Sequence, residues 1–289
     1  QISLHILSQM RALFLGTSAG KPSNHRNVTS IAVILQNEEY CLVDCGEATQ
    51  HQIMKSTLKL SKLREIYITH LHGDHIFGLF GLICSLNDIR NETLCIYGPS
   101  GLKNILASVI PFATNYNIEI KESSHNTHIK VAISRVSSGN YEYVVQQTKL
   151  LHNVNCFAYK IIQVRLKQQL DMKRFYPHMD LYVNELEKMG FSPANQIIEV
   201  LKKGLTITMN NGFVFDFNNY QLKENDVSLI IALDNYESRG MQFYFENCDV
   251  LIHECTYAIL PDMTQTQIDN INTLARSHYH STNRMAAFR

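Results

Sequence analysis

The stretch Ile68–Gly81, ITHLHGDHIFGLFG, decides the fold of this chain. Within it, three histidines and an aspartate fall inside six residues: His70, His72, Asp74 and His75. The run before it, Arg64–Thr69, is rich in Ile, Tyr and Thr and predicts a strand. The run after it, Ile76–Leu86, is apolar and predicts a buried helix. The four polar residues are therefore expected on a strand-to-helix turn, where Gly73 supplies backbone freedom.

This turn has the ligand chemistry and the spacing of a metal site. In an extended segment residues two apart point the same way, so His70 and His72 can reach one ion together. After the turn at Gly73, Asp74 and His75 project to a different side, which favours two adjacent metals over one. Imidazole and carboxylate suit zinc, with manganese or iron(II) as alternatives. A histidine-rich surface loop is the competing interpretation, but three histidines and an aspartate in this position favour the metal.

The pattern His-x-His-x-Asp-His after a strand resembles the metallo-β-lactamase superfamily, and other motifs narrow the resemblance. In chain order they are Phe14–Thr17 (FLGT), Arg26–Asn27, Leu42–Gln50 (LVDCGEATQ), Tyr97–Leu102 (YGPSGL), Asp249–Tyr257 (DVLIHECTY) and His280-Ser281-Thr282. The ordered set resembles ribonuclease Z, the tRNA 3′-end endonuclease, from about residue 12 to the last residue. The resemblance implies an α/β (α+β) fold, an αββα sandwich of two mixed β-sheets flanked by helices, as a single domain over residues 1–289.

Length and composition agree with such a domain. The chain has 289 residues, of which 45% are hydrophobic, enough for one large core. Its 26 basic and 26 acidic residues cancel, so RNA binding has to come from a local basic patch. Seven cysteines without framework spacing indicate reduced thiols and a cytoplasmic setting, with an organelle as the open alternative. No apolar run reaches the length of a membrane span, and the first residues do not resemble a secretory signal.

The resemblance also implies two zinc sites. Zinc one would be held by His70, His72, His152 and Asp234, and zinc two by Asp74, His75 and Asp234. Without the resemblance, a lone histidine such as His152 and a strand-end aspartate such as Asp234 favour structural roles. Family members complete the second site with a histidine beyond the His-Ser-Thr motif. Only nine residues follow His280 here, so we expect that the C-terminal end is either truncated or not included in this sequence, and that the last ligand of the second site lies outside it.

The implied chemistry is hydrolysis of a phosphodiester. A metal pair lowers the pKa of water and clamps the phosphate oxygens. Asp74 can accept the proton of the attacking water, and His280 can protonate the departing 3′ oxygen of the tRNA. His253 is expected to orient the site or pack beneath it. The products would be a tRNA 3′-hydroxyl and a trailer 5′-phosphate.

A basic stretch follows the central strands. Its cations Arg165, Lys167, Lys173 and Arg174 form the densest basic cluster of the chain. A solvated helical face is the plain interpretation, and contact with RNA phosphates is the functional one. The resemblance places an inserted tRNA-binding arm here, at about residues 163–195. It also implies a homodimer in which the arm of one subunit holds tRNA for the active site of the other.

Two other functions stay open at this stage. The chain could be another hydrolase of the same fold, acting on a thioester or a small phosphodiester, although the basic arm and the His-Ser-Thr motif argue against it. It could also be a metal-poor homologue that binds RNA without cutting it. The missing last histidine keeps that alternative open, as do Ala158 and Leu233, where the family favours glycine.

Overall fold

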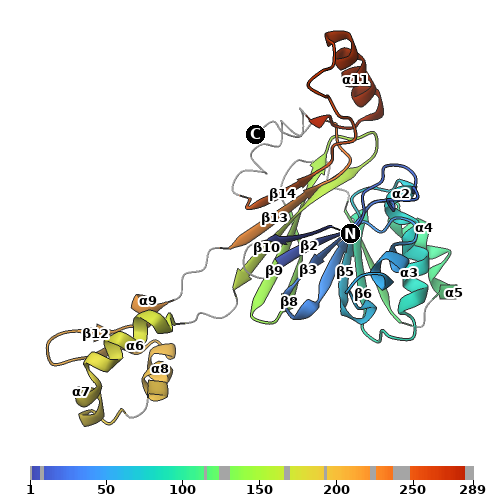
Figure 1. Cartoon of the computed structure of the whole chain (residues 1–289). Coiled ribbons are helices and arrows are strands. Elements are labelled where there is room, and N and C mark those ends of the chain that lie inside the picture. The colour runs from blue at the N-terminus through green and yellow to red at the C-terminus, as the bar shows by residue number, and fades with distance from the viewer. Residues whose placement is uncertain are drawn as a thin grey trace. The chain divides into compact units, whose positions relative to one another are not determined.

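The computed structural model describes residues 2–6, 10–113, 116–123, 131–165, 170–191, 194–221, 226–236 and 248–283. The chain forms two compact units (Figure 1). Unit 1 comprises Gln1–Val164 and Asp226–Arg289, and unit 2 comprises Arg165–Asn225.

Unit 1 contains two large β-sheets. The seven-stranded sheet has the order β1-β2-β3-β4-β5-β6-β7. Its strands are β1 (Ile2–Ile6), β2 (Met10–Gly16), β3 (Ser30–Ile34), β4 (Tyr40–Val43), β5 (Leu63–Tyr67), β6 (Leu94–Pro99) and β7 (Ile118–Ser123). Strands β1 to β4 pair antiparallel and β4 to β7 pair parallel, so the sheet is mixed.

The second sheet has five strands in the order β14-β13-β10-β9-β8. They are β8 (Val131–Ser138), β9 (Tyr141–Leu150), β10 (Cys156–Arg165), β13 (Val227–Ala232) and β14 (Val250–His253). Strand β13 is antiparallel to β10 and parallel to β14, so this sheet is mixed too. The expected two mixed sheets flanked by helices are confirmed.

The helices of unit 1 follow the strands closely. They are α1 (Thr49–Met54), α2 (Gly73–Ile76), α3 (Gly78–Leu86), α4 (Leu102–Ala107), α5 (Ile110–Ala113) and α11 (Gln265–His278), with short 3₁₀ turns at Gln36–Glu38 and Leu60–Lys62. The buried helix expected at Ile76–Leu86 is in fact two elements, α2 and α3, separated at Phe77. The first begins at Gly73, which places Asp74 and His75 in its first turn.

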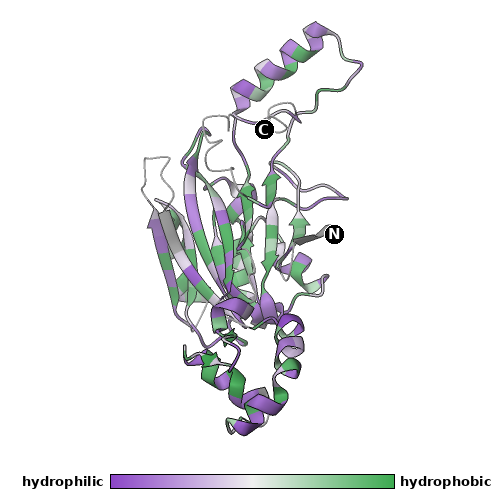
Figure 2. Ribbon diagram, turned by 90° about the vertical axis from the view of Figure 1, so that its left-hand side faces the viewer, coloured by the Kyte–Doolittle hydropathy of each residue, from purple (hydrophilic) through white to green (hydrophobic). Residues whose placement is uncertain are grey.

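Two apolar layers hold unit 1 together. One lies between the seven-stranded sheet and its helices, and its buried residues include Leu42, Ile66, Leu79 and Leu102. The other lies between the two sheets and includes Tyr67 and Tyr159. Figure 1 shows α3 and α4 on one side of the seven-stranded sheet, and Figure 2 shows apolar residues recurring along the strands. The sandwich thus buries both faces of the seven-stranded sheet, whose strands end near the turn that carries the histidines.

Unit 2 has a small core of its own. Its elements are α6 (Met172–Leu181), α7 (Val183–Lys188), α8 (Ala194–Lys202), β11 (Ile207–Thr208), β12 (Val214–Phe215) and α9 (Phe217–Tyr220). The ring of Phe175 lies 5.4 Å from that of Tyr220 and 6.1 Å from that of Phe215, centroid to centroid. Leu170, Leu186, Ile197 and Leu201 are buried with these rings. The arm expected at 163–195 corresponds to the first part of a compact unit that continues to residue 225.

Two further features concern membrane-spanning helices and the state of the cysteines. Among the described residues, no helix is long and apolar enough to cross a membrane. All seven cysteines lie in the described part of the chain, and each carries a free thiol.

Candidate metal centre

The second sheet holds the start of the histidine-bearing turn. The backbone N–H of Phe157 donates to the Thr69 carbonyl at 3.0 Å, and the Tyr159 hydroxyl donates to the Ile68 carbonyl at 2.6 Å. Both donors belong to β10. Because His152 lies just before β10, these bonds bring it toward the turn that carries His70.

At the other end of the turn, the backbone around Gly78 is packed so closely that this position has no room for a side chain. The N–H of Cys45 donates to the His75 carbonyl at 2.8 Å, and the N–H of Gly78 donates to the Cys45 carbonyl at 2.9 Å. A Cβ on Gly78 would lie only 1.9 Å from the carbonyl oxygen of Gly46. Glycine is therefore required where α3 starts, and this close approach fixes the position of α2.

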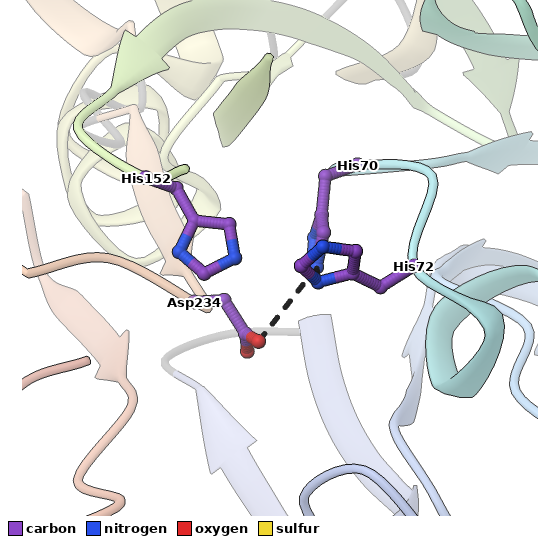
Figure 3. Close-up of side chains that lie close together, drawn as sticks. All are labelled: His70, His72, His152 and Asp234. Atoms are coloured by element: carbon purple, nitrogen blue, oxygen red, sulfur yellow. Dashed lines mark hydrogen bonds and ion pairs between the residues drawn. The ribbon is translucent and has the colours of Figure 1, made fainter. Parts of the chain in front are cut away.

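Four residues predicted for zinc one come together in the structure. One ligand atom from each of His70, His72, His152 and Asp234 lies within 4.8 Å of the others (Figure 3). Nε2 of His70 is 3.0 Å from Nδ1 of His72 and 3.7 Å from Oδ2 of Asp234. Figure 3 shows His70 and His72 on one loop and His152 on another, with Asp234 between them.

The three residues predicted for zinc two also converge. Nε2 of His75 lies 3.5 Å from Oδ2 of Asp74 and 3.5 Å from Oδ2 of Asp234. Asp74 also accepts a hydrogen bond of 2.7 Å from the Gly20 N–H. Since Oδ2 of Asp234 is near both His70 and His75, this carboxylate is shared by the two groups.

Three members of the first group, His70, His152 and Asp234, have the protonation states of metal ligands. Burial lowers the pKa of His70 to about 2, and burial also lowers the pKa of His152. Burial would raise the pKa of Asp234, but His75, His70 and His280 lower it below its ordinary value. The imidazoles of His70 and His152 are therefore neutral and the carboxylate is ionised, which is what metal binding requires.

Two buried nitrogen atoms offer further evidence that a cation fits. Among the described residues, Nε2 of His152 is buried without a hydrogen-bond partner, and Nε2 of His75 is buried with only the 3.5 Å contacts to Asp74 and Asp234, although buried polar atoms nearly always make a hydrogen bond. The opposite nitrogens are both occupied: Nδ1 of His75 lies 2.6 Å from Oδ2 of Asp44, and Nδ1 of His152 donates to the Tyr279 carbonyl at 2.9 Å. Metal-binding histidines show this arrangement, one nitrogen held by the protein and the other left for the ion.

The charge around His75 points the same way. Burial lowers its pKa, but the carboxylates of Asp44 and Asp234 outweigh burial and raise the pKa well above its ordinary value. The surroundings of Nε2 therefore favour a positive charge, which a divalent cation would also supply. The donors present fit a metal ion.

Asp44 supports the centre, and the sequence did not single it out as a site residue. It is fully buried and takes the left-handed backbone conformation, with φ of 59°, which is uncommon outside glycine but enriched in Asp and Asn. Its carboxylate accepts hydrogen bonds of 2.7 Å from both the N–H and the hydroxyl of Thr69, besides its contact with His75. The only signal was its place in the motif Leu42–Gln50.

Glu254 is the second residue missed. Its carboxylate accepts the N–H groups of Asn235 and Ser281 at 3.0 Å and lies 3.1 Å from Nδ1 of His280. The other ring nitrogen of His280 is 3.7 Å from Oδ2 of Asp234. Burial lowers the pKa of His280, but the Glu254 hydrogen bond and the Asp234 charge outweigh burial and raise it. His253 contacts the backbone of Glu254, because its Nδ1 lies 2.6 Å from the Glu254 carbonyl oxygen.

Comparison with known proteins decides the family. The family model of the anti-Pycsar protein Apyc1 matches residues 10–131, less than half of the chain. A ribonuclease Z from Pediococcus pentosaceus is 33% identical over 282 residues, and the match covers 96% of this chain and 83% of that one. The chain belongs to the ribonuclease Z family. The resemblance in its motifs is thereby confirmed.

Solved structures agree with this ribonuclease Z assignment. Human tRNase Z, short form, matches with a TM-score of 0.60 and 25% identity, covering 96% of this chain and 85% of that one. The metallo-β-lactamase fold protein YhfI from Bacillus subtilis matches with a TM-score of 0.54 and 15% identity, covering 96% and 80%. The metallo-β-lactamase fold is confirmed, and with the His/Asp group it indicates a divalent metal.

None of the basic residues predicted to bind RNA belongs to the metal cluster of the ribonuclease Z chain. Arg165 ends β10, and Lys173 and Arg174 are exposed in the first turn of α6. Lys167 lies outside the described residues. All four numbers fall within unit 2.

Proposed function

We propose that this chain is a metal-dependent endoribonuclease that removes the 3′ trailer from precursor tRNA. It would leave a 3′-hydroxyl on the tRNA and a 5′-phosphate on the trailer. The observation that supports this most is the convergence of His70, His72, His152 and Asp234 in a chain of the ribonuclease Z family. The buried Nε2 atoms of His75 and His152, neither of which makes a hydrogen bond within the described part of the chain, weigh against a metal-poor homologue.

The proposed cofactor is a pair of zinc ions in each subunit, with manganese as the alternative. His70, His72, His152 and Asp234 would hold the first ion, and Asp74, His75 and the shared Asp234 the second. When bound, the metals supply a low pKa for the attacking water and neutralise charge on the phosphate.

The side chains near the centre divide the proton transfers. Asp74 would take the proton of the attacking water, and its Oδ2 is held in place by the Gly20 N–H. His280 would give a proton to the leaving 3′ oxygen. Glu254 holds the His280 ring by Nδ1 and raises its pKa, so that the ring keeps its proton closer to neutral pH.

Unit 2 would provide the tRNA-binding arm. Lys173 and Arg174 are exposed at the start of α6, where their backbone N–H groups are capped by the Asp171 side chain. Cations are unfavourable in the first turn of a helix, since the helix dipole places positive charge there. Lys173 and Arg174 together with this end of the helix therefore give a positively charged surface that can bind phosphates. We further propose a homodimer in which each arm serves the active site of the other subunit.

A trailer-bearing tRNA tests the function directly. The purified chain, loaded with zinc, should release one trailer fragment, and end mapping should find a 3′-hydroxyl on the tRNA and a 5′-phosphate on the trailer. A chelator should stop cleavage and zinc should restore it. Hydrolysis of a small thioester without any cut in the tRNA would favour another hydrolase of this fold. Purified chain without bound metal and without cleavage would favour the RNA-binding homologue.

A further inference from the structure

A pocket of about 520 Å³ opens beside the metal centre in unit 1. Its wall is formed by Leu71, which lies between two histidines of the metal cluster, by Pro99–Ser100 at the end of β6, and by residues 149–155, which run from the end of β9 to the start of β10. His152 belongs both to this wall and to the metal cluster. The pocket is therefore adjacent to the metal cluster through His152. Neither of the residues proposed to transfer protons, Asp74 and His280, lines it.

One part of the wall is apolar and open to solvent. Leu71, Pro99, Leu151 and Val154 line it. Pro99 is buried and Leu71 half-buried, whereas Leu151 and Val154 keep 48% and 38% of their surfaces exposed. Apolar side chains gathered in a concave site and left exposed are typical of ligand-binding surfaces. A flat apolar group could lie against them.

The rest of the wall is polar and carries no acid. Ser100, Asn153 and Asn155 are exposed and offer one hydroxyl and two carboxamides, which can both donate and accept hydrogen bonds. Lys149 adds a positive charge, and no Asp or Glu occurs among the lining residues. The ligand that fits has a flat apolar face, an edge of donors and acceptors, and a negative charge nearby.

Resting on the proposed function, we propose that this pocket holds the base of a nucleotide directly adjacent to the scissile phosphate. An unpaired base has an apolar face that stacks and an edge that hydrogen-bonds, and its phosphates are anionic. Asn side chains commonly pair with base edges, and Lys149 would face the backbone charge. A volume of about 520 Å³ falls in the range of pockets for small ligands. The pocket then sets which nucleotide the enzyme prefers beside the cut.

The test compares trailer-bearing tRNAs that differ at a single nucleotide. One series carries an abasic site in the last nucleotide of the tRNA, the other in the first nucleotide of the trailer, and kcat/KM is measured against the matched natural substrate. The wild-type chain should lose roughly 5- to 100-fold with one of the two abasic substrates, as loss of a stacked base does in other single-strand binders. The position that responds identifies the nucleotide in the pocket.

Variants link the effect to this pocket. The double variant Asn153→Ala/Asn155→Ala and the pocket-filling variant Ser100→Trp should both bring the ratio of kcat/KM for natural and abasic substrates toward one. Because the ratio is taken within one variant, a general loss of activity cancels. Asn91→Ala, at an exposed asparagine that does not line the pocket, should keep the wild-type ratio.

The outcomes separate the two proposals. If wild-type chain cuts the tRNA but neither abasic substrate differs from its natural match, this inference is wrong and the proposed function stands. A ratio that stays at the wild-type value in both pocket variants also overturns it. If the wild-type chain cuts no trailer-bearing tRNA, the proposed function and this inference are both wrong.

Discussion

The metal centre in unit 1 and the basic surface in unit 2 are built in opposite ways. His70, His75 and His152 are buried and His72 is half-buried, and the second nitrogens of His75 and His152 are fixed by Asp44 and the Tyr279 carbonyl. Lys173 and Arg174, by contrast, are exposed, and they are attached to a small separate core around Phe175.

The difference follows from what each region has to do. Hydrolysis needs ligand and proton-transfer atoms at fixed positions, so the residue types and their spacing are tightly constrained. Binding a nucleic-acid backbone needs positive charge in roughly the right place, and many sequences can supply it. Substitutions in the metal centre should therefore have large effects on the rate of cleavage. Substitutions in the basic surface should have smaller effects on the affinity for tRNA.

The largest effect is expected for Asp74→Ala. This change removes a proposed ligand and the group proposed to accept the proton of water, so kcat for tRNA cleavage should fall by at least about 1,000-fold. Affinity for precursor tRNA should change little, because phosphate contacts dominate binding. Single-turnover cleavage and a filter-binding titration on the same preparation measure both quantities.

Asp88→Ala is the matched control for this change, since Asp88 is exposed and outside both metal groups. It should leave cleavage and binding at their wild-type values. If Asp74→Ala cleaves at a rate near that of wild type, the proposed role of Asp74 is wrong. A parallel loss of tRNA affinity would mean that the centre also anchors the substrate.

The next largest effect concerns the core of unit 2. Phe175 is fully buried among Phe215 and Tyr220, and Phe175→Ala should cost about 3–5 kcal/mol of stability in this unit. The two units have no core residue in common. Amide hydrogen exchange should therefore show loss of protection in α6 to α9, whereas the content of bound metal stays at the wild-type value.

The neighbouring Tyr176→Ala is the control, because Tyr176 is 43% exposed and its loss should cost little. If Phe175→Ala also removes the bound metal, the stability of the two units is coupled and the contrast between them is weaker than the separate cores suggest.

The same contrast explains what the sequence could predict. His70, His72, Asp74 and His75 are adjacent in the chain, so their spacing alone indicated a metal site. His152 is far away in sequence and was found only through the resemblance, because a single histidine before a strand has no pattern of its own.

Supporting residues were harder to predict. The roles of Asp44 and Glu254 depend on hydrogen bonds to His75 and His280, which exist only once distant segments meet. The extent of unit 2 could not be predicted from the charge pattern either, since α8 and the short strands after it join the Phe175 core through apolar contacts.

A smaller effect is expected for Glu254→Gln, which keeps the shape of the side chain but removes its charge. Glu254 helps to raise the pKa of His280, so its neutralisation should lower that pKa. A general acid loses activity as pH rises through its pKa, so the alkaline limb of the pH–rate profile should move to lower pH. The rate at neutral pH should fall by less than the roughly 10²–10⁴-fold that a general acid contributes.

His280→Ala serves as the reference for this change, because it removes the proposed acid itself and should abolish that limb. An unshifted alkaline limb in Glu254→Gln would mean that His280 is not the group that titrates.

The smallest effect should come from the pair Lys173→Ala/Arg174→Ala. Each phosphate contact that is lost should reduce the slope of log affinity against log salt by roughly 0.7–0.9. Two contacts would therefore flatten the slope by about twice that amount and weaken binding of precursor tRNA about tenfold at moderate salt. The content of bound metal should not change, since neither residue lies in a metal group. The matched control is Lys55→Ala/Lys59→Ala, which removes two exposed cations from unit 1 and keeps the same net charge as the test pair.

Equal slopes in the two double variants would show that only total charge matters and that the unit 2 cations are a solvated face. A selective loss in the unit 2 pair would establish that surface as part of the tRNA site, distinct in its salt dependence from the buried metal centre.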